Sequence, residues 1–111
     1  MADINISGDA QCTLVEVSGR IDSMNANQFG DALNATIDDG KVHIVLDLGS
    51  VDFMSSAGLR ELVNAFKKAK KASGDVRLAQ PSDRVREVLE MAGLDTIFRI
   101  YETRTEAVGS Y

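Results

Sequence analysis

The chain has 111 residues, of which 44% are apolar and 26% charged, and its formal net charge at pH 7 is −5. This length suits one compact domain, and the composition is that of a globular protein and not of a disordered one. The negative charge disfavours broad binding to nucleic acid or anionic lipids. No signal-peptide pattern and no apolar run of roughly 20 residues indicates export or a membrane span, so we expect a single cytoplasmic domain over residues 1–111.

Two segments rich in β-forming residues open the chain. Residues 3–7 alternate apolar and polar side chains, and residues 12–18 contain several β-branched ones. Gly8-Asp9 lies between them and is typical of a turn. These features predict a β-hairpin whose second strand is broken by Gly19.

A helix and a buried strand are expected next. Residues 24–38 place apolar side chains three or four positions apart, which predicts a helix with Ser23 or Asn25 as its N-cap and Gly40 at its end. Residues 42–48 are almost continuously apolar. Such a short apolar run is typical of a strand covered on both faces of a parallel sheet.

The second half of the chain repeats this alternation. We expect a connection over 49–56, a helix over 57–72, a strand over 75–80, a helix from about 83 to 92, a short strand over 97–101 and a last helical turn over 103–109. Strands that alternate with helices predict an α/β fold with a mixed, mainly parallel sheet of four to five strands. Its N-terminal edge is antiparallel, and three to four helices pack on it.

Most catalytic groups are missing from the sequence. The one histidine, His43, lies in the apolar strand and is expected to be partly buried, and a single histidine and a single cysteine cannot supply a zinc or iron site. A triad of His43 with Ser55 or Ser56 has no support from spacing, and no phosphate-binding loop is present. The lysine-rich segment 67–71 is interpreted as a solvated helix face. We therefore expect no enzyme activity, no metal and no cofactor.

The two adjacent serines are the informative feature, because they lie where the helix over 57–72 is expected to begin. A hydroxyl there can cap the free amides of the first turn, which is a purely structural interpretation. The residues three positions after Ser55 and Ser56 are Gly58 and Leu59, so a capping box is not formed. The other interpretation is phosphorylation, since a helix N-terminus accommodates the negative charge of a phosphoserine.

Three segments, in the same order and spacing, resemble the STAS domains of anti-anti-sigma factors. They are VSGRIDSMNANQF (17–29), VDFMSSAGLREL (51–62) and VRLAQPSDRVREVLEMAGLDTIF (76–98), and the resemblance covers essentially the whole chain. It implies a mixed sheet with helices packed on it, which agrees with the fold expected from the residues. It also implies a regulatory protein, an anti-sigma factor antagonist that works by switching partners.

In that family the unphosphorylated protein binds an anti-sigma factor that is also a serine kinase with a histidine-kinase-like ATPase domain, and the sigma factor is released. Phosphorylation ends the binding, and a phosphoserine phosphatase resets the protein. The resemblance implies Ser56 as the acceptor, with Ser55, where many members carry an aspartate, as the alternative. It implies a partner-binding surface around these serines, formed by Asp22, Ser23, Met54, Ser55, Ser56, Gly58 and Leu59.

Two other functions stay open on the sequence. One is a constitutive STAS interaction subunit of a transporter, lipid-transport or signalling-scaffold complex, without phosphorylation. The other is a small hydrolase or nucleotide-binding enzyme that uses Ser55 or Ser56. The chain is expected to be a monomer, with a weak dimer as the alternative. Its sigma factor, its anti-sigma partner and its physiological output are not encoded in any recognisable motif.

Overall fold

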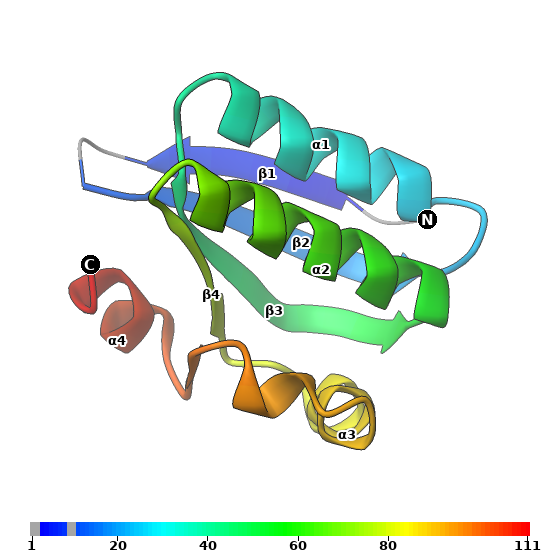
Figure 1. Ribbon diagram of the computed structural model, residues 1–111. Helices are drawn as coiled ribbons and strands as arrows, with labels where there is room; N and C mark the ends of the chain where they lie inside the picture. Colours follow the sequence, from blue (N-terminus) through cyan, green and yellow to red (C-terminus); the bar gives the residue numbers. More distant parts are fainter. Residues whose placement is uncertain (1–2, 9–10) are drawn as a thin grey trace.

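The computed structural model describes residues 3–8 and 11–111, which fold into a five-stranded sheet with helices on both faces (Figure 1). The strands are β1 (Asp3–Gly8), β2 (Thr13–Ile21), β3 (His43–Met54), β4 (Asp75–Ala79) and β5 (Ile100–Tyr101). The helices are α1 (Ala26–Asp38), α2 (Ser56–Lys71), α3 (Asp83–Met91), the 3₁₀ turn η1 (Leu94–Thr96) and α4 (Arg104–Gly109).

The strands lie in the order β1-β2-β3-β4-β5. β1 pairs with β2 in antiparallel orientation, while the pairs β2–β3, β3–β4 and β4–β5 are parallel. The expected mixed α/β fold and its hairpin are therefore confirmed. Asp9 of the expected turn, like the first two residues, lies outside the described residues.

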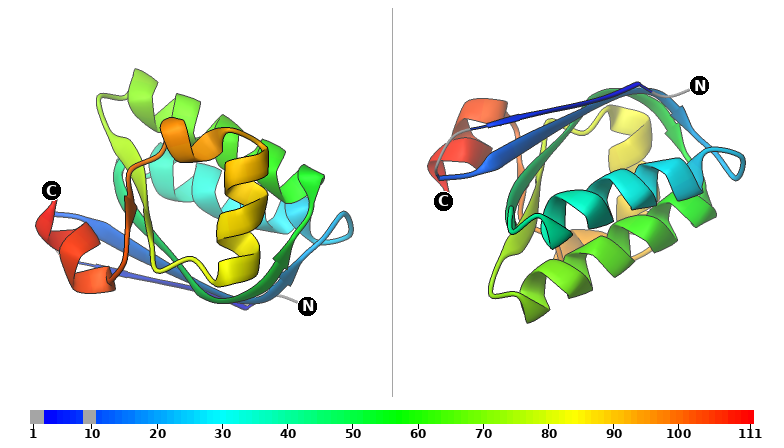
Figure 2. Two further views of the ribbon diagram at one scale, coloured as in Figure 1. Left: turned by 90° about the horizontal axis from the view of Figure 1, so that it is seen from below. Right: turned by 90° about the horizontal axis from the view of Figure 1, so that it is seen from above.

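The main core lies between the sheet and helices α1, α2 and α3. It is formed by alternate side chains of β2, β3 and β4 and by the inner faces of the helices, including Phe29, Leu33, Leu62, Val85 and Leu89. α1 and α2 run side by side over this face (Figure 2). A smaller cluster on the other face joins Cys12, Val45 and Ala79 to Ala107 of α4, so α4 covers one end of that face.

Two expectations about strand ends are wrong. Gly19 does not break β2, because its left-handed φ of 94° sits at a register shift between Gly19 and Arg20 that the strand passes through. A glycine adopts such a φ without steric cost. β3 likewise continues through the expected connection 49–56 to Met54, because Ser50–Met54 pair with Ser18–Ile21.

Three smaller expectations also need correction. His43 is the first residue of β3 and exposed, where a partly buried mid-strand position was expected. Only Ile100–Tyr101 of the segment 97–101 form a strand. Asn25 is the N-cap residue of α1, but its side chain makes no capping hydrogen bond to the helix.

Candidate functional site

The carboxyl ends of β2 and β3 meet at one end of the sheet and lead directly into α1 and α2. Ile21 and Met54 end the two strands and are partners in the parallel register. The backbone N–H of Ser55 donates to the carbonyl of Ile21 at 2.8 Å. The loop after β2 and the turn after β3 are therefore fixed beside each other, although Ile21 and Ser55 are 34 positions apart in the sequence.

The two serines have different roles in this turn. Ser55 is the N-cap of α2, with extended backbone (φ −79°, ψ 169°), and its Oγ accepts from the Gly58 N–H at 3.2 Å. Ser56 is the first helical residue and is exposed. Its hydroxyl makes no hydrogen bond within the described chain. One hydroxyl is therefore occupied by capping, while the other faces solvent.

Buried residues support the turn from beneath. Ile21 and Met54 are 0% and 2% exposed. A Cβ built at Gly58 would lie 2.7 Å from Cγ2 of Ile21, closer than real Cβ contacts come, and 3.1 Å from Cγ of Met54, which is tighter than most. Gly58 therefore lets the domain's own core pack tightly under the helix start.

This packing changes the expected partner surface. Met54 and Gly58 are buried, so their side-chain positions face the core and not an incoming protein. Leu59 is partly buried and packs against the main core. These three residues shape the turn, while Ser56 and the adjacent loop form its accessible surface.

The loop between β2 and α1 is held by its own polar side chains. Asp22 Oδ1 accepts from the backbone N–H groups of Met24 at 3.0 Å and Asn25 at 3.2 Å. Asn25 Oδ1 accepts from the Asp22 N–H at 2.8 Å, and its side-chain amide donates to the carbonyl of Arg20 at 2.7 Å. Asp22 thus shapes the loop, and Ser23 stays exposed.

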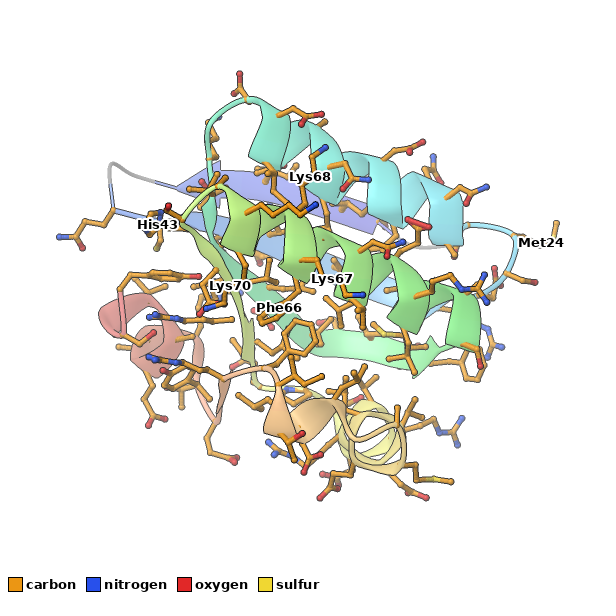
Figure 3. The ribbon with its side chains drawn as sticks, viewed as in Figure 1. Met24, His43, Phe66, Lys67, Lys68 and Lys70 are labelled. Atoms are coloured by element: carbon orange, nitrogen blue, oxygen red, sulfur yellow. The ribbon has the colours of Figure 1, made fainter. Side chains whose placement is uncertain are left out.

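This loop presents Met24 to solvent, at 92% exposure the most exposed large apolar side chain of the described chain. Figure 3 shows it pointing outward from the end of the molecule where α1 and α2 begin. Sequence reasoning missed Met24, although one signal was available. It stands between capping-type residues and outside the apolar stripe that begins at Ala26, so no core position was assigned to it.

The local electrostatics favour an anion at this end. The Asp22 carboxylate lies just before α1, whereas α2 carries no acidic residue in its first turn that would offset its positive dipole end. Arg60, one turn after Ser56 in α2, is exposed and forms no ion pair within the described chain. An added phosphate on Ser56 would meet favourable charges on its own domain.

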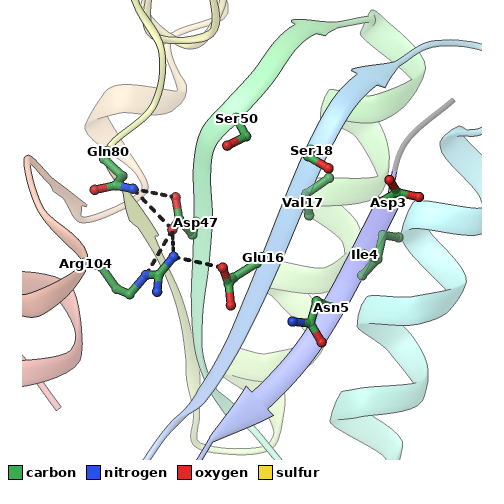
Figure 4. A pocket seen from close by; sticks show the side chains of 10 residues that line it. All are labelled: Asp3, Ile4, Asn5, Glu16, Val17, Ser18, Asp47, Ser50, Gln80 and Arg104. Atoms are coloured by element: carbon green, nitrogen blue, oxygen red, sulfur yellow. Dashed lines mark hydrogen bonds and ion pairs between the residues drawn. The ribbon is translucent and has the colours of Figure 1, made fainter.

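A second polar cluster lies on the opposite face of the sheet, in a hollow of about 250 Å³ (Figure 4). The buried Asp47 carboxylate accepts from Arg104 Nη2 at 2.7 Å, from Gln80 Nε2 at 3.1 Å and from the Gly49 N–H at 2.9 Å. Arg104 Nη2 also donates to Glu16 Oε2 at 2.9 Å. These bonds, above all the one to Asp47, raise the pKa of the Arg104 guanidinium.

This cluster has the character of a structural clamp. The Asp47 oxygens accept from donors of β3, α4 and the segment after β4, so this carboxylate ties the three segments together. The imagined triad fails, because His43 begins β3 whereas Ser55 follows its last residue. No group of three or more metal-ligating side chains occurs in residues 3–8 and 11–111. Within the same residues, no helix is long and apolar enough to cross a membrane.

Comparison with known proteins agrees with this architecture. The STAS domain family matches residues 3–107. The chain is 36% identical over 95 residues to the Bordetella bronchiseptica protein named "Putative anti-sigma factor antagonist BtrV", covering 86% of this chain and 82% of that one.

Among solved structures, an anti-sigma factor antagonist from Mycobacterium paratuberculosis superposes with a TM-score of 0.90. It is 27% identical and covers 99% of this chain and 93% of its own. Bacillus SpoIIAA in its phosphorylated form has the same fold, with a TM-score of 0.77 at 19% identity, covering 97% and 98% of the two chains. The family match over residues 3–107 shows that this chain is a member of the STAS domain family.

Proposed function

We propose that this protein is an anti-sigma factor antagonist, a non-enzymatic regulator that binds an anti-sigma factor and is switched off by phosphorylation of Ser56. The relatives named above carry this function in their names, and it reaches this chain through the shared family. The observation that supports the switch is that the two serines have different roles. Ser55 caps α2, while the Ser56 hydroxyl is exposed and makes no hydrogen bond within the described chain.

The partner surface consists of the exposed residues Ser23, Met24 and Ser56 together with Arg60. Met24 supplies an apolar anchor on a loop that is already fixed by hydrogen bonds, so little conformational entropy is lost when it binds. The partner is an anti-sigma factor with serine kinase activity. A phosphatase that removes the phosphate completes the cycle.

A phosphate at Ser56 acts through the interface and not through the fold. It adds about −1.5 to −2 charges where two surfaces must close. A charge that is buried without a partner costs several kcal/mol, and each 1.4 kcal/mol is about tenfold in affinity. One phosphate is therefore sufficient to release the partner.

The site assignment is tested by incubating the protein with the anti-sigma factor kinase of the same organism and ATP, followed by intact-mass spectrometry. Wild type should gain one phosphate and Ser56→Ala none. Ser55→Ala is the matched control. It should still be phosphorylated, although loss of the cap costs about 1 kcal/mol of stability. Equal phosphate incorporation in Ser56→Ala and wild type would show that the acceptor lies elsewhere.

The alternative, a constitutive STAS interaction subunit, is separated from this proposal by Ser56→Asp. The phosphorylation switch predicts that this variant binds the anti-sigma factor at least tenfold more weakly than wild type. A constitutive subunit predicts unchanged affinity. Isothermal titration calorimetry measures the difference directly.

A further inference from the structure

The end of the molecule opposite Ser56 has an unexpected charge. There the C-terminal ends of α1 and α2 meet the first residues of β3 and β4, about 24 Å along α2 from Ser56. The side chains of this basic end are Lys41, Lys67, Lys68, Lys70, Lys71, Arg77 and Arg99, with Asp38, Asp39 and Asp75. They carry a net charge of +4 in a chain whose total is −5. Figure 3 shows Lys67, Lys68 and Lys70 along α2, with His43 nearby.

Part of this charge is fixed in place. Lys68 Nζ lies 2.7 Å from Asp38, Lys70 Nζ lies 3.5 Å from Asp75, and Arg77 Nε lies 3.0 Å from the same carboxylate. The Arg77 guanidinium also stacks on the Tyr111 ring at 4.0 Å. The Asp75 ion pairs and the stacking on Tyr111 form part of the wall of a hollow of about 300 Å³, which is lined by Lys70, Asp75, Arg77 and Arg99, among others.

Lys41 Nζ also lies 3.4 Å from Asp39 Oδ2, which leaves three cations of the basic end without an acidic partner. Lys67, Lys71 and Arg99 are all exposed, and none forms an ion pair within the described part of the chain. A lysine in the last turn of α2 is favoured by the helix dipole, which accounts for Lys71. Arg99 precedes β5 and lies on no helix, yet its side chain lines the hollow together with Lys70 and Arg77. The helix dipole therefore does not explain the cation at Arg99.

We propose that the basic end is a second docking surface, which takes an acidic segment of a protein partner. Carboxylates match its charge, and the exposed Lys67, Lys71 and Arg99, which form no ion pair within the described part of the chain, are open to engage them. A nucleic acid fits less well, because the rest of the chain carries a net charge of −9 that would repel a long phosphate backbone. The surface is remote from Ser56, so its occupancy is independent of phosphorylation there.

The test uses hexaglutamate peptide as the probe and two-dimensional amide NMR of the full chain as the readout. Peptide should shift resonances around Lys67, Lys71 and Arg99, and the shifts should weaken with added salt. Lys67→Gln/Lys71→Gln/Arg99→Gln should lower the affinity at least tenfold. Arg20→Gln/Arg84→Gln/Arg86→Gln removes the same charge elsewhere and should leave the affinity within twofold.

Two results would overturn the proposal. One is equal loss of peptide affinity in both triple variants, which would show a response to overall charge alone. The other is tighter binding of a thymidine oligonucleotide of equal charge at the same residues, which would mark a nucleic-acid surface instead.

Discussion

The serine pair was interpreted either as a helix cap or as a phosphorylation site, and the structure shows that the two serines differ in this respect. The missing capping box left the hydroxyls less committed to a structural role, but Ser55 caps α2 without a glutamate three positions later. Adjacent serines cannot be ranked from sequence, because the rank depends on which one holds the extended N-cap conformation. Met54 and Gly58 show the same limit, since motif position does not reveal that both face the core.

Met24 provides a residue-scale prediction. Met24→Ala should weaken binding to the anti-sigma factor about tenfold, because a solvent-facing apolar anchor is removed while the loop hydrogen bonds remain. Met91→Ala is the matched control, since Met91 is 82% exposed and lies at the end of α3. Calorimetric affinities that fall equally in both variants would exclude Met24 as an anchor.

Tyr111 gives a prediction about pH. Its hydroxyl oxygen lies within hydrogen-bond distance of the carbonyl oxygens of Ile44 and Asp75, which share its one proton, and burial, together with the Asp75 charge, raises the pKa of Tyr111. A raised pKa favours the neutral hydroxyl in the folded state. The stability linked to it is complete below the ordinary tyrosine pKa of about 10 and is lost as pH rises above it.

Urea unfolding at pH 9 and pH 11 measures this linkage. The free energy of unfolding should fall more between these two values in wild type than in Tyr111→Phe, which has no hydroxyl to ionise. An equal fall in both proteins would mean that the hydroxyl of Tyr111 is not linked to stability.

At the scale of elements, sequence periodicity located most helices and strands but not the ends of strands. Residues 49–54 look like a connection, because Gly49, Ser50 and Asp52 interrupt the apolar run. They are nevertheless strand, because the end of β2 offers them a pairing partner. Such pairing between distant segments cannot be recognised from a short stretch of neighbouring residues. The docking of α4 was equally hidden, since Asp47 and Arg104 are 57 residues apart.

The clamp that holds α4 predicts a stability effect. Arg104→Met removes charged hydrogen bonds from Asp47, which is 5% exposed, and should lower the free energy of unfolding by about 2 kcal/mol. Arg86→Met breaks only the bond to an exposed Glu102 and should cost less than about 1 kcal/mol. Denaturant titration compares them, and equal losses would contradict the role of the clamp.

In the whole molecule, the end that carries Ser56 and the basic end lie at opposite ends of α2 on one folded domain. The STAS architecture was predictable from sequence because strand and helix patterns alternate and three motifs follow in order. The gathering of Met24 with Ser56 was not, because it depends on the Ile21–Met54 register and the Ser55 hydrogen bond. Phosphorylation at this end is expected to leave the fold intact.

We predict that the domain stays folded when Ser56 is phosphorylated. Phosphoserine at position 56 meets the uncompensated N-terminus of α2 and can pair with Arg60 one turn later, a spacing that brings helical side chains together. The melting temperature should therefore be unchanged or rise by a few degrees. A fall of ten degrees in differential scanning calorimetry would mean that phosphate acts by unfolding the domain.

The most direct measurement compares the affinity of the anti-sigma factor for this protein with and without phosphate on Ser56, installed at full occupancy. The account predicts tight binding of the unphosphorylated protein and at least a hundredfold weaker binding of the phosphorylated one, with both forms equally folded by circular dichroism. Equal affinity of the two folded forms would contradict it.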